Sequence, residues 1–394
     1  MDSESQAAYL QTVVGQAFEA EFGRTAEVIA RAPGRVNMIG EHTDYNDGFV
    51  LPIAIDRAVY VAAAARNDDA VNLVAHDFDD RASFDLSDIR FDEEHRWSNY
   101  PRGVAWALRQ RGLALRGMDA VIGGDVPIGA GLSSSAAIEV ATATALRALS
   151  GFNLPEVEMA LAAQEAENRF VGMSCGIMDQ FISVLGQRGR ALLIDCRSLD
   201  YQSVPLPPGC DVIVANTMKR RELVDSEYNR RRAECEEGVH RLREFVPGIR
   251  ALRDVSLEDL QRHAGRLPEN VLRRCRHVVS ENARALAAAT ALREGDAQGF
   301  GQLMVASHES LRKDYEVSCD ELDEAVRVAL EEPGVYGARM TGAGFGGCTV
   351  NLVARESSRQ VEEALARGYE RWAGVRPEIY VCRAEDGAEA KRLR

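Results

Sequence analysis

The sequence predicts a protein of the α/β (α+β) class that is built from two domains. Its 394 residues fit about two domains of ordinary size, and a hydrophobic content of 46% is enough for a sizeable core. The first half mixes alternating runs with helical patterns, whereas the second half is mostly helical with a small sheet. Between them, the Pro-Leu-Pro-Pro-Gly stretch at 205–209 is typical of a domain junction. We therefore place the domains at residues 1–208 and 209–394.

The amino-terminal domain is predicted to combine helices with strands. Its first strand should end where Pro33-Gly34 interrupts the alternation. Residues 71–76 are expected to pair as a hairpin with the strands before them. The predicted helices are 6–22, 99–112 and 155–170, and the predicted strands are 26–32, 50–55, 58–65, 71–76, 119–125 and 191–195.

The carboxyl-terminal domain is predicted to be largely helical, and the charged faces of its helices are typical of solvated surface. Its last strand can return to the amino-terminal domain. The predicted helices are 225–244, 256–263, 268–293, 297–313, 319–331 and 356–370, and the predicted strands are 211–216, 348–353 and 376–382.

Composition excludes several functional classes. A net charge of −14 and a pI of about 5.1 argue against nucleic acid as a partner of the whole surface. We expect no membrane span, because no apolar run reaches 18 residues, and no signal peptide at Met1–Ala8. The eight cysteines, scattered from Cys175 to Cys382 without a Cys-x-x-Cys pair, predict reduced thiols in a cytoplasmic protein rather than a disulfide or zinc framework.

The stretch Gly129-Ala-Gly-Leu-Ser-Ser-Ser135 is a loop that turns into a helix, which should end at Gly151. The serines can cap that helix. Free N–H groups and the positive end of the helix dipole then make an anion site, most often a phosphate site. It lacks the lysine of a Walker loop, and Ser135 stands where a hydrolase elbow needs glycine. An ordinary glycine-serine turn that caps a helix is the alternative.

Residues 34–45 form a second polar segment, and Asn-Asp-Gly at 46–48 signals a turn after it. Arg35, Glu41, His42 and Asp44 lie there between apolar flanks. A cation, two carboxylates and an imidazole can supply the donors and acceptors that a polyhydroxylated ligand needs. A polar turn without chemistry is the other interpretation.

Two further carboxylates are candidates for chemistry. Asp179 lies among apolar neighbours, so it is either buried and paired, used as a base, or a helix-capping residue. Glu165 fits a surface carboxylate. For Glu167 a metal role is preferred: we interpret residues 129–135 as a site for ATP phosphates, ATP chemistry needs magnesium, and Mg²⁺ takes carboxylate oxygens.

The last glycine cluster, Gly342-Ala-Gly-Phe-Gly-Gly347, matches the spacing of a dinucleotide fingerprint. That fingerprint must open a helix, whereas residues 348–353 alternate like a strand. Gly342, Gly344, Gly346 and Gly347 therefore predict a supporting turn between two strands, close to a bound ligand.

Three motifs in this order resemble those of the GHMP family of small-molecule kinases and, within it, the galactokinases. Gly34–Tyr45 resembles the galactokinase signature, Pro127–Ala137 the phosphate loop of the family, and Arg339–Cys348 its third glycine motif. Residues 175–183, 191–199, 252–255, 312–319 and 335–337 are also similar, so the resemblance covers roughly residues 25–385. Met38 and Ser174 are mild departures, and neither has a proposed role. The resemblance implies an amino-terminal half like ribosomal protein S5, a ferredoxin-like carboxyl-terminal half, and an active site in the cleft.

The resemblance also implies the reaction, which is phosphorylation of the C1 hydroxyl of α-D-galactose by MgATP. Asp179 would take the C1 proton, and Arg35 would stabilise the developing charge and help hold Asp179 ionised. Whether Asp179 is a formal base stays open. Ser135 and Glu167 would hold Mg²⁺. The triphosphate would lie on Gly129, Ala130, Gly131, Leu132, Ser133, Ser134 and Ser135, and the sugar would contact Arg35, Glu41, His42, Thr43, Asp44, Gly176, Asp179 and Tyr228.

Two alternatives within this resemblance remain. One is a kinase for another sugar, such as N-acetylgalactosamine or arabinose. The other is a non-catalytic galactose sensor, but the known sort shortens the serine loop, and Ser133–Ala137 is intact here. The expected partners are D-galactose and ATP, without nucleic acid or membrane, and the expected state is a monomer or weak homo-oligomer.

Overall fold

A six-stranded sheet organises the amino-terminal half of the computed structural model, which describes residues 3–219 and 224–393. Residues 1, 2 and 394, at the ends of the two predicted domains, lie outside that range. The strand order is β13-β1-β3-β6-β4-β5. The bounds are β1 Val28–Asn37, β3 Pro52–Ala65, β4 Ala70–Ala75, β5 Asp80–Asp85, β6 Met118–Gly124 and β13 Glu389–Arg392.

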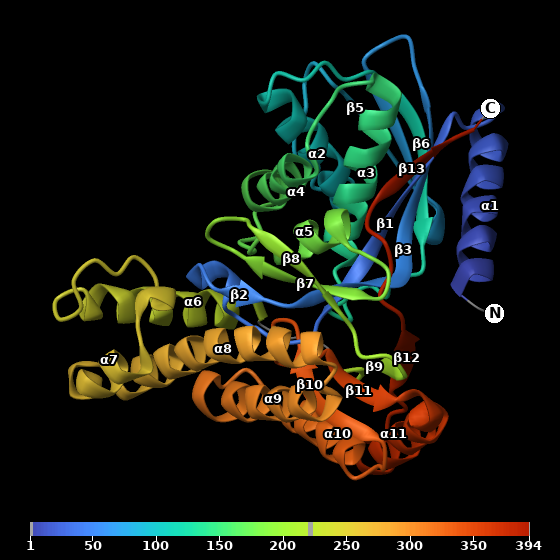
Figure 1. Cartoon of the computed structure of the whole chain (residues 1–394). Helices are drawn as coiled ribbons and strands as arrows, with labels where there is room; N and C mark the ends of the chain where they lie inside the picture. Colours follow the sequence, from blue (N-terminus) through green and yellow to red (C-terminus); the bar gives the residue numbers. More distant parts are fainter. Residues whose placement is uncertain (1–2, 220–223, 394) are drawn as a thin grey trace.

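Helices cover both faces of this sheet. Helix α1 (Ser3–Phe22) packs against β3 and β6 on one face, while α3 (Ser134–Ser150) packs against β1 and β3 on the other, with α2, α4 and α5 around it (Figure 1). As predicted, α3 ends at Gly151, where φ is +73°. The other bounds are α2 Asn99–Gln110, α4 Glu156–Glu165 and α5 Met178–Leu185; a π-helical turn, Ala166–Val171, continues α4.

Several strand predictions are corrected by the pairing. Strand β1 continues through Pro33-Gly34 to Asn37, because a register shift between Pro33 and Arg35 accommodates the proline within the ladder. The predicted strands 50–55 and 58–65 belong to one long strand, β3, apart from the short β2 (Phe49–Val50). Strand β4 pairs with β5 and, in parallel, with β6, and not with the strands before it. Strand β6, which follows α2 in the chain, lies between β3 and β4 in the sheet.

A three-stranded sheet, β2-β7-β8, lies at the junction of the halves. Strand β7 (Arg190–Asp195) was predicted, whereas β2 and β8 (Tyr201–Pro205) were not. The two missed strands are short, so alternation along the sequence gives little signal for them.

The carboxyl-terminal half contains a four-stranded sheet in the order β10-β11-β9-β12 and six helices among the described residues. The strands are β9 Cys210–Asn216, β10 Val335–Thr341, β11 Cys348–Ala354 and β12 Glu378–Cys382, and the helices are α6 Val224–Leu242, α7 Leu257–Arg262, α8 Glu269–Glu294, α9 Ala297–Ser310, α10 Asp320–Leu330 and α11 Ser358–Ala373. A π-helical turn, Leu311–Tyr315, follows α9. Strand β10 is the strand expected before the glycine cluster, although its bounds were not predicted.

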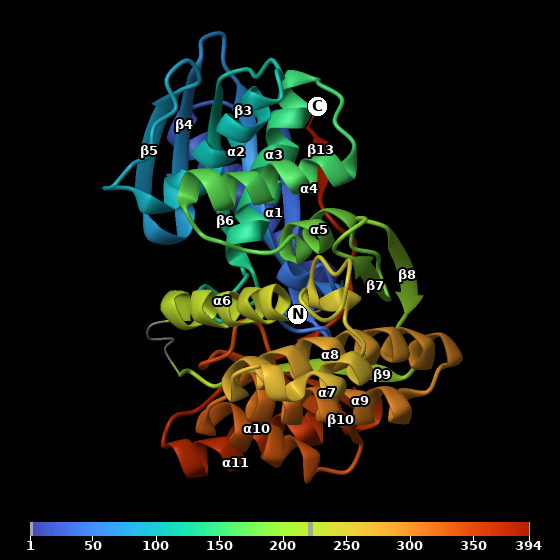
Figure 2. The same cartoon turned by 90° about the vertical axis from the view of Figure 1, so that its left-hand side faces the viewer.

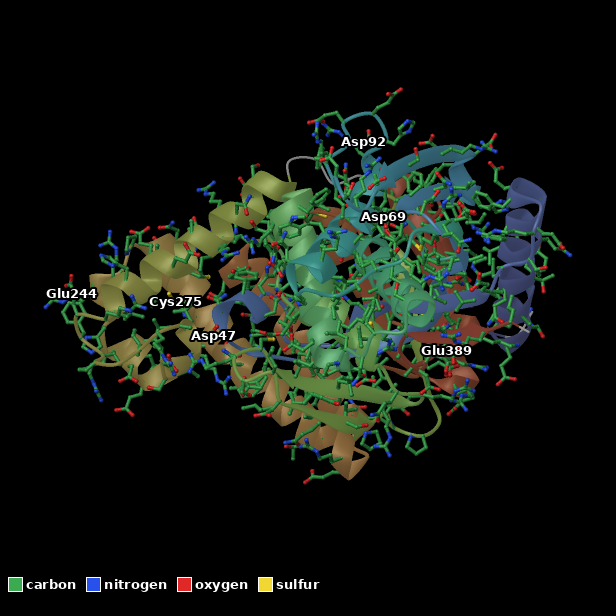
Figure 3. All side chains as sticks on the ribbon, turned by 90° about the horizontal axis from the view of Figure 1, so that it is seen from above. Asp47, Asp69, Asp92, Glu244, Cys275 and Glu389 are labelled. Atoms are coloured by element: carbon green, nitrogen blue, oxygen red, sulfur yellow. The ribbon has the colours of Figure 1, made fainter. Side chains whose placement is uncertain are left out.

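Helices α6, α7 and α8 form an arm that projects from the body of the molecule (Figure 1). Figure 3 shows Glu244 at its outer end and Glu389 on the opposite side of the molecule. Figure 2 shows the inner part of this arm beneath α5, so α6 and α8 lie where the two halves meet.

The two halves are fixed to each other by shared elements. The largest hydrophobic cluster includes residues of the six-stranded sheet together with Val214 of β9, Val350 of β11 and Ala288 of α8. After β12 the chain crosses back, and β13 pairs with β1. The strand at 378–382 is therefore not the last one, and the predicted boundary near residue 208 stays a prediction. No helix in residues 3–219 and 224–393 is long and apolar enough to cross a membrane.

Candidate active site

A cavity of about 1090 Å³ lies between the halves, and both contribute to its wall. Its wall contains side chains from the three sequence motifs and from the ends of α5 and α6. The predicted residues that line it are Arg35, Glu41, His42, Asp44, Gly129, Gly131, Ser133, Ser134, Ser135, Glu167, Gly176, Asp179, Tyr228 and Gly342. We call residues 38–49 the acidic turn and residues 127–135 the glycine-serine loop.

Arg35 and Asp179 form the central pair of the cavity. The guanidinium donates from Nε to Oδ1 at 2.7 Å and from Nη2 to Oδ2 at 2.6 Å, the two-pronged geometry that suits a carboxylate. Its third nitrogen, Nη1, donates to the carbonyl of Gly131 at 2.6 Å. Arg35 therefore joins Asp179 to the glycine-serine loop.

Gly34 explains why Arg35 reaches that loop. The backbone N–H of Arg35 donates to the Leu132 carbonyl at 3.0 Å, and a Cβ on Gly34 would lie 2.7 Å from the same oxygen. Any larger residue would push the loop away. The glycine of the first motif thus brings the first and second motifs together.

Ser133 differs from its predicted role as a helix cap. It is the residue before α3, and its backbone is left-handed, with φ +60°. In this conformation the hydroxyl donates to Oδ2 of Asp179 instead of capping the helix. Asp179 begins the first turn of α5, and three donors from Arg35 and Ser133 fix its carboxylate.

The rest of the glycine-serine loop is partly exposed. Gly129 and Gly131 have φ values of +74° and +83°, which only glycine adopts easily. Ala130 and Leu132 are buried and face away from the cavity, and Cys348 of β11 donates from Sγ to the Ala130 carbonyl at 2.9 Å. The roles of these two residues in nucleotide binding stay predictions.

Glu167 lies in a group of polar side chains next to Ser135, which hydrogen-bonds to it. Gln180 donates to Glu167 Oε2 at 2.6 Å, and the Cys175 thiol donates to the same oxygen at 3.2 Å. Burial raises the pKa of Glu167. A carboxylate and a hydroxyl are both oxygen donors, so this pair suits a hard cation that also takes phosphate oxygens. Glu165 instead pairs with Arg111 and Arg169 away from the cavity.

Glu41 in the acidic turn is held by the third glycine motif. Its carboxylate accepts hydrogen bonds from the Asn37 side chain and the Gly342 N–H, and Arg339 lies 3.4 Å away. Burial raises the pKa of Glu41, and the charge of Arg339 opposes this. Gly344 approaches Val317 so closely that a Cβ would lie 2.2 Å from its carbonyl oxygen, and strand β11 follows the cluster. The prediction of a strand after these glycines is confirmed.

His42 belongs to a buried aromatic group. Its Nδ1 lies 2.7 Å from the Tyr45 hydroxyl, which lies 2.7 Å from the Tyr315 hydroxyl. The ring of Tyr228 lies 5.7 Å from the His42 ring. Burial lowers the pKa of His42 well below its usual value, so the imidazole is neutral.

Asp44 and Gly176 face each other across the cavity wall. A Cβ on Gly176 would lie 1.8 Å from Oδ2 of Asp44, so only glycine leaves room for that carboxylate. Burial, and then the charge of Asp179, raise the pKa of Asp44 to about 7. Thr43 is not in the wall; its hydroxyl lies 2.8 Å from the Gly40 carbonyl oxygen and 2.7 Å from that of Phe49, and it can donate to either.

Several residues of the wall were not predicted. Ser174 lines the cavity although no role was proposed for it, and Lys219 lines it and pairs with Glu321 at 2.9 Å. These side chains belong to no motif with a mechanism, so the sequence carried no signal for them. The others are Tyr45, Ile128, Met173, Cys175, Met178, Asn216, Met218, Ser226 and Ala343.

Comparisons with known proteins agree with this geometry. A family model described as the galactokinase galactose-binding signature matches residues 16–65, and models for the GHMP kinases N terminal domain and the GHMP kinases C terminal match residues 99–187 and 288–371. The galactokinase of Roseiflexus sp. (strain RS-1) is 53% identical over 94% of both chains. That of Chloroflexus aurantiacus is 54% identical over 94% of this chain and 95% of its own.

Solved structures of related kinases are also similar to this chain. The crystal structure of Lactococcus lactis galactokinase complexed with galactose matches with a TM-score of 0.93 and 36% identity, over 98% of this chain and 100% of that one. A mevalonate kinase structure, 20% identical and with a TM-score of 0.65 over 91% of this chain and 99% of its own, shares the fold. Relatives more than half identical over nearly the whole length, with all three motifs around one cavity, establish the family. The chain belongs to the galactokinase family of GHMP kinases.

Proposed function

We propose that this chain transfers the γ-phosphoryl group of ATP to the C1 hydroxyl of α-D-galactose, giving galactose 1-phosphate and ADP. The C1 oxygen forms a new bond to phosphorus while the bond between phosphorus and the β,γ-bridging oxygen breaks, and the hydroxyl proton leaves. The observation that carries the proposal is the fixed Arg35–Asp179–Ser133 group, which lies where the acidic turn and the glycine-serine loop meet. A sugar bound at the acidic turn and a triphosphate bound at the glycine-serine loop would meet at this group.

Asp179 is proposed to receive the C1 proton. Its two oxygens already accept three hydrogen bonds, so its orientation is set before a substrate binds. Arg35 is proposed to balance the negative charge of this carboxylate and of the transferring group. Phosphoryl transfer needs mainly alignment and charge neutralisation, which is what this pair supplies.

The glycine-serine loop is proposed to bind the phosphates through backbone N–H groups at the start of α3. The oxygen donors of Ser135 and Glu167 suit Mg²⁺, and we propose that they hold it. When bound, the ion would neutralise phosphate charge. Gln180 and Cys175 keep one Glu167 oxygen engaged, which supports the orientation of the carboxylate toward Ser135.

The acidic turn is proposed to select the sugar. Glu41, His42 and Asp44 offer fixed acceptors and donors, and Tyr228 closes the wall beside them. An epimer that leaves one of these buried groups unpaired would bind much more weakly.

The direct test is ADP release by the purified protein with MgATP and a panel of D-galactose, N-acetylgalactosamine, glucose and L-arabinose. We expect strong turnover with galactose. Turnover with another sugar only would change the substrate and keep the mechanism, and galactose binding without turnover would favour a sensor.

We also propose a cytoplasmic location and a monomer or weak homo-oligomer. All eight cysteines are free thiols, which supports a reducing compartment. Light scattering across a range of protein concentrations measures the assembly state, and fractionation of the source cells tests the location.

A further inference from the structure

Helix α8 reaches from the carboxyl-terminal half to the backbone of the acidic turn. Three of its side chains make this contact: His277, Glu281 and Asn282. His277 and Glu281, four residues apart, lie on one side of the helix, and Asn282 follows Glu281 directly. Figure 2 shows α8 close to the junction of the two halves, and α8 contacts β2, which begins at the end of the acidic turn.

Glu281 makes the most extensive contact of the three. Its Oε1 accepts hydrogen bonds from the N–H groups of Gly40 at 2.9 Å and Glu41 at 3.3 Å. The Ser307 hydroxyl of α9 donates to the same oxygen at 2.6 Å, and Arg284 Nε donates to Oε2 at 2.6 Å. The side chain has no exposed surface, so this charge depends on these partners.

The acidic turn has a backbone that needs such support. Gly40 has φ +97°, and a Cβ there would lie 2.5 Å from the Phe49 carbonyl oxygen. His42 has φ +63°, a left-handed conformation that is uncommon for a residue with a side chain. Such conformations persist only where the surroundings hold them. Glu281 binds the N–H groups directly before His42.

The other two side chains hold the same turn at further points. His277 Nε2 lies 3.1 Å from the Glu41 carbonyl oxygen, and its Nδ1 lies 2.9 Å from the Ser310 hydroxyl. Asn282 Oδ1 accepts from the Phe49 N–H at 2.9 Å. Burial lowers the pKa of His277 to about 4, so the ring is neutral and can donate from Nε2 to that carbonyl. Helix α8 thus binds both ends of the acidic turn.

We infer that Glu281 is a positioning residue for sugar binding, which acts through the Gly40–Glu41 backbone to aim Glu41 and His42 into the cavity. This inference rests on the proposed function, because it takes the acidic turn to be the sugar site. Glu281 itself does not line the cavity. Its loss should therefore weaken galactose binding and leave the glycine-serine loop, on the other side of the cavity, unchanged.

The test compares Glu281→Gln and Glu281→Leu with the wild type. Glutamine keeps a neutral acceptor, and we expect the Kd for galactose to rise about fivefold; leucine leaves two N–H groups without an acceptor, and we expect a rise of about tenfold to a hundredfold. The Kd of MgADP should stay within about twofold in both. Glu294→Gln is the matched control, because Glu294 is an exposed residue of the same helix.

Calorimetry with galactose alone and with MgADP alone gives the two affinities, and a thermal melt gives the stability of each variant. A role in stability only would lower the melting temperature and leave both affinities of the folded protein unchanged, which would overturn the inference. An equal loss of sugar and nucleotide affinity would also overturn it.

Ser307→Ala provides a second, milder variant if the Glu281 variants do not fold. It removes one donor to Glu281 Oε1, and we expect a twofold to threefold rise in the galactose Kd, about the effect of one weakened hydrogen bond. An unchanged Kd in this variant would then overturn the inference. Wild-type protein that does not bind galactose refutes the proposed function itself, whereas normal wild-type binding with unaffected variants refutes only the role of Glu281.

Discussion

The acidic turn and the glycine-serine loop border the same cavity but are held in different ways. Most residues of the acidic turn are buried, and side chains from distant elements bind its backbone and its carboxylates, among them Glu281, Asn282 and Arg339. The glycine-serine loop is more exposed, with Ile128 67% accessible. Its backbone is held by Arg35 and Cys348, and its serine hydroxyls bind the carboxylates of Asp179 and Glu167.

This difference follows from what each segment is proposed to recognise. To distinguish sugar epimers, a site must hold each donor and acceptor in place. A misplaced group would lower the affinity for the correct sugar as well as for its epimer, and the site would lose its selectivity. To bind phosphates, N–H groups at a helix start suffice, and some freedom allows nucleotide to enter and leave. The predictions below ask whether substitutions on one side leave the other side unchanged.

The largest effect is expected at the point where the two sides meet. Asp179→Asn should lower kcat by about 10²- to 10⁴-fold, because the amide cannot receive the C1 proton. Nucleotide affinity should change little, since Asp179 belongs to α5 and the amide oxygen of asparagine can still accept from Ser133 and Arg35, which join it to the glycine-serine loop. Steady-state kinetics and MgADP calorimetry measure both values. Asp200→Asn, an exposed carboxylate, serves as control, and normal turnover in Asp179→Asn would remove this residue from the mechanism.

A substitution on the nucleotide side should affect the metal and spare the sugar. Glu167→Gln should raise the Mg²⁺ concentration needed for half-maximal activity by about tenfold to a hundredfold. Titration with Mn²⁺, followed by electron paramagnetic resonance, gives metal affinity without turnover. Glu165→Gln is a close control, because that carboxylate pairs with Arg111 and Arg169 instead. Identical metal titrations for Glu167→Gln and wild type would exclude Glu167 as a ligand.

On the sugar side, Gly176→Ala should weaken galactose binding by about tenfold, because the new methyl group would displace the Asp44 carboxylate. Nucleotide affinity should stay near that of the wild type. Gly265→Ala is the control, since a Cβ there meets no other atom within 4 Å and its φ is not positive. If Gly176→Ala binds galactose normally, Asp44 is not required in its present position.

The smallest effect concerns stability and pH. The pKa of Asp44 is about 7 in the folded protein and 3.8 as its ordinary value, so the folded state holds the proton more tightly. This contribution to stability is complete below pH 3.8 and is lost as pH rises through about 7. The melting temperature of Asp44→Asn, measured relative to that of the wild type, should therefore rise between pH 5 and pH 8. For a protein of this size we expect a rise of about a few degrees.

Melts of both proteins in the absence of sugar measure this difference. A constant difference across that pH range would show that Asp44 titrates normally. Galactose affinity of Asp44→Asn at pH 8 gives a second reading, because replacing an ionised acceptor by an amide should weaken binding if Asp44 contacts the sugar.

Much of the molecule could be predicted from local sequence signals. Except for α5, each helix from α1 to α11 was predicted from its sequence pattern, and Gly151 ends α3 where predicted. Arg35, Asp179, Ser135 and Glu167 were selected from motifs, and the structure brings all four to one cavity. Predictions failed where local spacing says little about pairing: β4 joins β6, β1 runs through Pro33, and a further strand, β13, follows β12.

The sequence by itself determined most of the helices and the central strands, the glycines that permit close approach, and the chemistry of the motifs. These depend on neighbouring residues, which periodicity and turn preferences report. Only the tertiary structure decided that Ser133 binds Asp179, that Glu281 holds the acidic turn, and that Asp44 lies against Gly176. Each of these contacts joins residues far apart in the chain. Their position depends on how whole layers pack when apolar surface is buried, and that information is spread over the fold.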